Sequence, residues 1–195
     1  MKEPNNTPSK DKNNNTLNRQ NNTIKLAKMG MLVAISVILV YLIHFPIFPT
    51  TPFLEYDPAD IPIFIGTFAF GPLAGLTLTV VTSLVQGLTV SATGGWFGIL
   101  MHILATGSFV LVAGLIYRKS KTRKGAMIAM AAGTLTMTTV MAVANIVLDP
   151  IFYGMPVSGV YAMLPFIIGF NLIKAGANSV ITFLLYKRIS RFLHK

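Results

Sequence analysis

Three polar side chains interrupt the apolar run of residues 161–186. Asn171, Lys174 and Asn178 stand at i, i+3 and i+7, and with 3.6 residues per helical turn this spacing puts them on one face of a helix. A lysine inside a membrane span costs about 2.5–3.5 kcal/mol, so it is normally retained for function or for pairing. The pattern favours a pocket in which amine and amide groups hold a polar ligand. Internal pairing without a ligand is the alternative.

Two carboxylates occur three residues apart in 57-DPADIP-62. An acid/base pair would use this chemistry, but it would need a nucleophile or metal partner, and none stands nearby in the sequence. The residues also make a complete helix start: Asp57 as N-cap, Pro58 at the first helical position and Asp60 in the first turn. The sequence therefore predicts that these carboxylates begin a helix.

The remaining residue types offer little chemistry. His44 and His102 are single histidines near the ends of apolar runs, without the spacing of a metal site. The chain contains no cysteine, which excludes disulfides and Cys-ligated metals. It also has no GxSxG, Walker or GxGxxG motif. We predict neither a metal site nor an enzyme.

The composition is that of an integral membrane protein. Hydrophobic residues make up 53% of the chain and charged residues 11%, whereas soluble domains carry about 25% charge. The net charge of +10 comes from clusters beside apolar runs, in the N-terminal segment, at 118-RKSKTRK-124 and at 187-KRISRFLHK-195. Such clusters are typical of topology signals and argue against nucleic-acid binding. We expect a multi-pass protein of the cell membrane, surrounded by lipid.

The apolar runs predict six transmembrane helices. A span needs about 20 apolar residues, and five stretches qualify: 28–44, 61–90, 97–117, 125–148 and 161–186. Five crossings would place the basic loop 118–124 outside, against the positive-inside rule. The turn signal Gly71-Pro72 divides the second stretch into helices at about 61–71 and 73–90. We therefore predict an all-α bundle of six transmembrane helices with both termini in the cytoplasm.

The predicted outer loops are 45–60, 91–96 and 149–160, which lack lysine and arginine. The first is long, proline-rich and aromatic, as expected of a stiff lid, and contains Phe53, Leu54 and Asp57. Asn145, at the outer end of its predicted helix, is placed to face the polar groups of the last helix. A ligand pocket in the outer half of the bundle is the favoured interpretation.

The N-terminal part of the chain suggests two further features. Residues 1–22 are asparagine-rich and polar, which predicts a disordered cytoplasmic tail ahead of a membrane domain at 23–195. In the first apolar helix, Gly30 and Ala34 form a small-residue face. Such a face allows close helix approach, either within the bundle or against a partner protein.

Four segments resemble a known family: 57-DPADIP-62, 70-FGPLAGL-76, 145-NIVL-148 and 170-FNLIKAG-176. They are similar to the substrate-binding S components of energy-coupling-factor (ECF) vitamin transporters, most closely the riboflavin-specific ones, over about residues 25–190. The resemblance implies a six-helix subunit without an ATPase of its own. Its implied partners are a transmembrane T component and two cytoplasmic ATPases.

The resemblance also implies roles for individual residues. Asn145, Asn171 and Lys174 would hydrogen-bond a flavin ring, the loop 45–60 would be the lid, and the Gly30/Ala34 face would dock on the T component. Aromatic contacts are available near the outer end, with Tyr56 and Phe64 as our candidates beside Trp96 and Tyr153. Asn178 has no implied role.

Together these observations predict a riboflavin-binding S component, with riboflavin as the transported ligand and no resident cofactor. An S component for another vitamin is one alternative. A small intramembrane enzyme or assembly factor, with Lys174 and Asp57 in chemical roles, is the alternative from another class.

Overall fold

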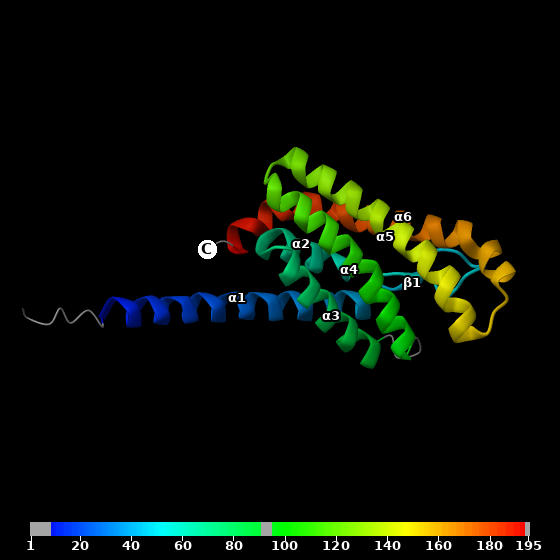
Figure 1. The fold of residues 1–195 in the computed structure, drawn as a ribbon, viewed down its shortest axis with the longest axis horizontal. Coiled ribbons are helices and arrows are strands. Elements are labelled where there is room, and N and C mark those ends of the chain that lie inside the picture. Colours follow the sequence, from blue (N-terminus) through cyan, green and yellow to red (C-terminus); the bar gives the residue numbers. More distant parts are fainter. Residues whose placement is uncertain (1–8, 91–94, 194–195) are drawn as a thin grey trace, which may run out of the picture.

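The computed structural model describes residues 9–90 and 95–193, which form a bundle of six α-helices (Figure 1). The helices are α1 (Ser9–Leu42), α2 (Asp60–Phe70), α3 (Pro72–Leu88), α4 (Gly95–Lys119), α5 (Arg123–Tyr153) and α6 (Val157–Leu193). Within the predicted lid loop, the two-residue strands β1 (Phe45–Pro46) and β2 (Glu55–Tyr56) pair antiparallel. The prediction of a helical protein with six helices is confirmed.

Four of these helices are long and apolar enough to cross a membrane: α1 from Arg19, α4, α5, and α6 as far as Tyr186. Helices α2 and α3 are shorter, with 11 and 17 residues. Large apolar side chains point outward from the bundle, among them Leu115, Leu135 and Leu184. This outward apolar surface suits contact with lipid, as expected of an integral membrane protein.

The break between α2 and α3 lies where the turn signal predicts it. Gly71 has φ 96°, a left-handed conformation that favours glycine. Its N–H donates to the Thr67 carbonyl at 2.8 Å and closes α2. Pro72 then occupies the first turn of α3, where its missing N–H costs nothing.

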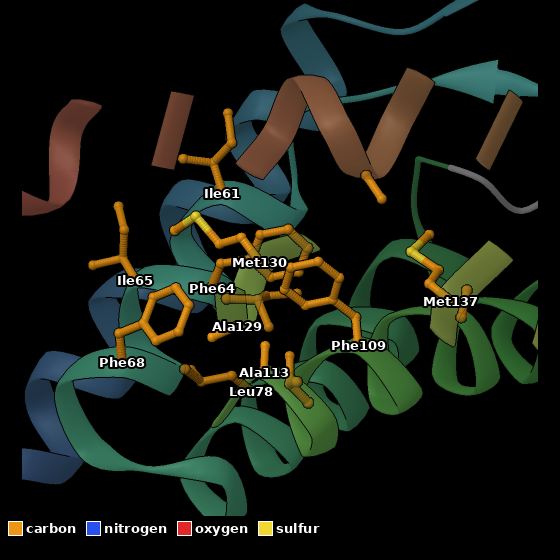
Figure 2. Packing of buried hydrophobic residues seen from close by; sticks show 14 of the residues in the cluster. Ile61, Phe64, Ile65, Phe68, Leu78, Phe109, Ala113, Ala129, Met130 and Met137 are labelled. Carbon is orange, nitrogen blue, oxygen red and sulfur yellow. The ribbon is translucent and has the colours of Figure 1, made fainter. Parts of the chain in front are cut away.

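Helix α2 lies at the centre of the bundle and packs against α1, α3, α4 and α6. Its residues from Asp60 to Phe68 are all buried. Figure 2 shows the core around it, where the rings of Phe64 and Phe109 stack with centroids 3.8 Å apart and planes at 10°. Met130 of α5 and Leu78 of α3 belong to the same cluster.

The structure shortens two of the predicted outer loops. Helix α5 continues to Tyr153, so Asp149 is a buried helical residue and not part of a loop 149–160. Pro150 lies inside the last turn of α5, so the helix does not end before this proline. Helices α4 and α6 begin at Gly95 and Val157, earlier than predicted. Of the predicted loop 91–96, residues 91–94 lie outside the described part.

Helix α1 begins at Ser9, within the segment predicted to be a disordered tail. Figure 1 shows this first part of α1 projecting beyond the other helices. A helix already nucleated by the apolar run propagates more easily than a new one forms, which accounts for helix at residues 9–22. Residues 1–8 lie outside the described residues, and the division into tail and membrane domain stays a prediction.

Candidate functional site

A cavity of about 460 Å³ lies among α3, α4, α5, α6 and the loop between α1 and α2. Its walls are mostly apolar and aromatic with a few polar groups, the usual composition of a small-molecule site. The lining residues are Phe53, Glu55 and Asp57 of the loop, Ser83, Gln86 and Gly87 of α3, Gly98, Ile99, Met101, His102 and Ala105 of α4, Met137, Met141 and Tyr153 of α5, and Phe170, Asn171 and Lys174 of α6.

Lys174 lines this cavity and forms an ion pair with the loop. Its Nζ donates to Asp57 Oδ2 at 2.6 Å, and the two side chains are only 8% and 16% exposed. The Phe170 ring lies 5.8 Å from the same Nζ. Lys174 is therefore paired inside the protein, as one of the two interpretations of the sequence expects. It also borders the cavity, as the other interpretation expects.

The two predicted asparagine ligands differ in position. Asn171 lines the cavity and donates from Nδ2 to the Ile167 carbonyl of its own helix at 2.8 Å. Asn145 is buried and donates to the Met141 carbonyl at 2.7 Å. Asn145 is absent from the cavity lining, within the residues that the structure describes, but Met141 one turn earlier belongs to it. Asn171 and Lys174 thus come together at the cavity, whereas Asn145 is not among its lining residues.

Asn178 anchors the loop to α6. It is fully buried, its Nδ2 donates to the Asp57 carbonyl at 3.1 Å, and its Oδ1 accepts from the Tyr56 hydroxyl at 2.9 Å. Burial, together with the Asp57 carboxylate, raises the pKa of Tyr56, so this phenol stays protonated and able to donate. Tyr56 is therefore an anchor of the loop and lies outside the cavity lining given above.

The two carboxylates lie at and just before the start of α2 and contact neighbouring helices. The prediction that Asp57 is the N-cap is wrong, because α2 begins at Asp60 with Ala59 as its N-cap and without a side-chain cap. Asp57 Oδ1 instead accepts from the Ala59 N–H at 3.0 Å in the turn before the helix. Asp60 is fully buried and accepts from Thr106 at 2.7 Å and from His102 Nε2 at 3.3 Å. Among the described residues, no group of three His, Cys, Asp or Glu side chains is arranged to hold a metal ion.

The aromatic and lid candidates separate into three environments. Phe64 is fully buried in the core against Phe109, and the cavity wall lies elsewhere, so the expectation that Phe64 contacts the ligand is corrected. The reason is that α2, apolar apart from Asp60 and Thr67, is enclosed by other helices. Phe53 is 59% exposed and borders the cavity. Leu54 is buried against Ile167 and Phe170 of α6.

The small-residue face of α1 points away from the bundle. Gly30 and Ala34 are exposed, and a Cβ added at Gly30 would meet no atom within 4 Å. The buried side of α1 carries Leu32, Ser36 and Val40 instead. The sequence left two roles open for this face, packing inside the bundle or docking on a partner protein. The structure shows that it does not pack inside the bundle.

Sequence reasoning missed the polar groups that α3 and α4 bring to the cavity. Ser83, Gln86 and His102 all line it. A detectable signal exists, because Ser83 and Gln86 stand three residues apart in a short apolar helix, the same kind of spacing that singles out α6. Sequence motifs identify histidines such as His102 only as metal ligands. A histidine in an apolar run can equally form hydrogen bonds to other side chains.

Comparison with known proteins places this arrangement in a family. The model of the family described as "ECF transporter, substrate-specific component" matches residues 24–186. The chain is 34% identical over 187 residues to the riboflavin transporter RibU of Staphylococcus aureus (strain TCH60), covering 92% of this chain and 96% of that protein. It is 31% identical over 126 residues to the riboflavin transporter FmnP of Bacillus subtilis (strain 168), covering 64% and 65% of the two chains.

The fold agrees with these sequence matches. A solved structure described as the S component of a bacterial ECF transporter superposes with a TM-score of 0.75 at 34% identity, covering 90% of this chain and 99% of the other. The family consists of transporter components and not of enzymes, which is consistent with a cavity lined by binding groups. This chain belongs to the family of ECF transporter substrate-specific components.

Proposed function

We propose that this chain is a riboflavin-binding S component that captures riboflavin at the outer side of the cell membrane for uptake driven by partner ATPases. The observation that carries the proposal is the cavity of about 460 Å³, in which Lys174 and Asn171 share the walls with aromatic and apolar residues. The relatives named as riboflavin transporters support riboflavin as the ligand. Riboflavin is the transported molecule and not a resident cofactor.

The polar groups of α6 retain donors for a flavin ring. The Lys174 ammonium has three N–H groups, of which one is used by Asp57. Asn171 uses one N–H on a carbonyl of its own helix and keeps its second N–H and its carbonyl. Flavin carbonyls and ring nitrogens accept such bonds. In our proposal Lys174 and Asn171 bind the ring directly, and Asn145 is the third hydrogen-bonding residue.

The loop between α1 and α2 serves as the lid in this proposal. Phe53 borders the cavity, and Leu54 packs on Phe170 of α6. The ion pair from Asp57 to Lys174 connects the lid to the group that binds the ligand. Closure of this loop would remove the ligand from water and strengthen its polar contacts.

We further propose six crossings with both termini in the cytoplasm. Helices α3 and α4 each run from the cavity to a second hollow of about 320 Å³ at their other ends. Lys25, Arg118 and Lys121 line that hollow together, so basic residues from distant segments share one end of the bundle. The positive-inside rule places such an end in the cytoplasm and the cavity on the outer side.

Binding of riboflavin tests the proposed function directly. Titration of the purified protein in detergent with riboflavin is expected to quench flavin fluorescence in a 1:1 ratio, because the ring enters a cavity whose lining includes aromatic side chains. The ligand should be recovered unchanged after incubation, as expected of a carrier subunit. Unchanged fluorescence over the whole titration would contradict riboflavin as the ligand. Loss of substrate in detergent alone would instead favour an enzyme.

The exposed face of α1 is proposed to dock on the T component. The double variant Gly30→Leu/Ala34→Leu fills this face, and we expect it to lose co-purification with a co-expressed T component and ATPase pair because two helices can no longer approach closely. Riboflavin binding by the isolated subunit should be unchanged. Ala131→Leu, at an exposed position of α5, is the matched control and should assemble normally. Equal assembly of both variants would contradict the assignment.

A further inference from the structure

The second hollow, of about 320 Å³, lies where α2 ends and α3 begins. Gly71 and Pro72 of this break line it together with Gly114 of α4. A Cβ added at Gly114 would meet the Pro72 Cβ at 2.8 Å, so α4 approaches the break closely and bounds one side of the hollow. The residues that line it are all different from those of the cavity assigned to riboflavin. The hollow therefore needs an explanation of its own.

Three cationic side chains from separate segments meet at this hollow. They are Lys25 of α1, Arg118 in the last turn of α4, and Lys121 of the connection to α5. The Lys25 Nζ lies 5.9 Å from the centroid of the Phe70 ring, which also lines the hollow, so this ammonium is held at the wall. A topology signal needs basic residues beside a span, but it does not need residues of distant segments to converge on one hollow.

The carboxylates of the chain lie elsewhere. The chain has six acidic residues, and four of them are at the opposite end of the bundle: Glu55, Asp57, Asp60 and Asp149. Asp11 precedes Lys25 in α1 by about 21 Å along the helix axis, at 1.5 Å per residue. Glu3 lies outside the described residues. No carboxylate of the described residues is therefore placed to neutralise the three cations, which suits an anion from another molecule.

The helix ends at the break contribute little net charge. The N-terminal end of α3 carries a partial positive charge and the C-terminal end of α2 a partial negative charge, and the two ends meet at Gly71. The charge of the hollow is thus that of its three cationic side chains. A phosphate group matches them, because its oxygens accept several charge-assisted hydrogen bonds from lysine and arginine.

The hollow also has an apolar side that faces the surroundings of the bundle. Leu73 lines the hollow and is 77% exposed, as expected of a side chain that contacts lipid. A free phosphate would use only the cations, whereas a phospholipid would use the cations with its headgroup and Leu73 with an acyl chain. Basic pockets between transmembrane helices on the cytoplasmic side bind anionic headgroups in this way. The combination of charge and exposed apolar surface favours a lipid.

We propose that the second hollow binds the phosphate of an anionic phospholipid, with Lys25, Arg118 and Lys121 as its ligands and Leu73 against an acyl chain. The bound lipid connects α1, the break between α2 and α3, and α4 at one end of the bundle. Its position in the inner leaflet rests on the proposed topology. The site itself does not depend on riboflavin binding.

Native mass spectrometry of the full-length protein in detergent tests the site with two lipids of equal chains, dioleoylphosphatidylglycerol and dioleoylphosphatidylcholine. We expect the wild type to retain one phosphatidylglycerol molecule in preference to phosphatidylcholine. The variant Lys25→Gln/Arg118→Gln/Lys121→Gln should bind phosphatidylglycerol at least about tenfold more weakly, because three charges near the headgroup are removed. Its riboflavin affinity should equal that of the wild type, since the hollow and the cavity share no lining residue.

The matched control is Lys119→Gln/Arg123→Gln/Lys124→Gln. It removes the same charge from exposed positions of the same end of the bundle, outside the lining of the hollow, and should bind phosphatidylglycerol as the wild type does. Equal loss in both triple variants would show attraction by overall charge and overturn the proposal, as would equal retention of the two lipids by the wild type. If the first triple variant does not fold, Lys25→Gln alone should weaken binding about fivefold, and unchanged binding would overturn the proposal.

Two further results distinguish a lipid from other ligands. Displacement of phosphatidylglycerol by inorganic phosphate would show a site for a free anion, and the lipid proposal would be wrong. It would also be wrong if the hollow variant kept its phosphatidylglycerol but no longer co-purified with a T component and ATPase pair, because the hollow would then be a contact for a protein partner. A failure of the proposed function is seen separately, since a protein that binds no riboflavin can still retain phosphatidylglycerol.

Discussion

Lys174→Met is expected to weaken riboflavin binding by about a hundredfold and to lower the free energy of unfolding by about 3–5 kcal/mol. The variant removes a charged donor from the ligand site. It also leaves the Asp57 carboxylate, 16% exposed, without its cation. Fluorescence titration gives the affinity, and denaturant unfolding of the ligand-free protein in detergent gives the stability.

A double variant separates these two effects. Lys174→Met/Asp57→Asn has no unpaired charge, and the asparagine introduced in place of Asp57 would still offer a side-chain oxygen to the Ala59 N–H. We expect the stability to return to within about 1 kcal/mol of the wild type, with riboflavin binding still weak. Recovery of binding in the double variant would show that Lys174 acts only by neutralising Asp57 and does not contact the ligand.

Phe64→Ala is expected to lower the free energy of unfolding by about 3–5 kcal/mol, the usual cost of removing a buried phenylalanine. Phe64 is fully buried and stacks on Phe109, so the variant leaves a cavity that the surrounding helices cannot fill. The milder Phe64→Leu keeps most of the volume. It should lower stability less and change riboflavin affinity by less than about twofold, because Phe64 does not reach the cavity.

Phe53→Leu provides the opposite case. Phe53 is 59% exposed and borders the cavity, so its replacement should weaken riboflavin binding with little change in stability. Unfolding curves and fluorescence titrations of both leucine variants form the comparison. If Phe64→Leu weakens binding more than Phe53→Leu does, the ligand lies closer to α2 than the cavity indicates.

The number of helices was predictable because it depends on local features. Apolar runs set the helices, and the Gly71-Pro72 pair marks a turn by its backbone preferences alone. The basic loop 118–124 then required an even number of crossings before it. These features need no knowledge of which helices touch. The end of α5 was not predictable in the same way, because a proline such as Pro150 ends some helices and sits in the last turn of others.

Only the part of the site that lies on α6 was predictable from the sequence. Lys174 and Asn171 stand out because polar groups are rare in an apolar run. The partner of Lys174 is Asp57, 117 residues earlier, and only the packing of α2 against α6 decides that pairing. Phe64 was misplaced for a related reason. Helix α2 is apolar apart from Asp60 and Thr67, so periodicity does not distinguish its core side from a side that meets a ligand.

The central position of α2 has a consequence for how the protein senses the bilayer. At about 1.5 Å per residue, the 11 residues of α2 span about 17 Å, well short of the hydrocarbon core of about 30 Å. Since its neighbours shield it from acyl chains, the hydrophobic mismatch of α2 is absorbed by protein and not by lipid. The thickness of the membrane therefore acts on the helices that expose apolar side chains, which include the four long ones and α3 with Leu73, Leu84 and Leu88. Helix α2, which directly follows the lid, is shielded from changes in membrane thickness.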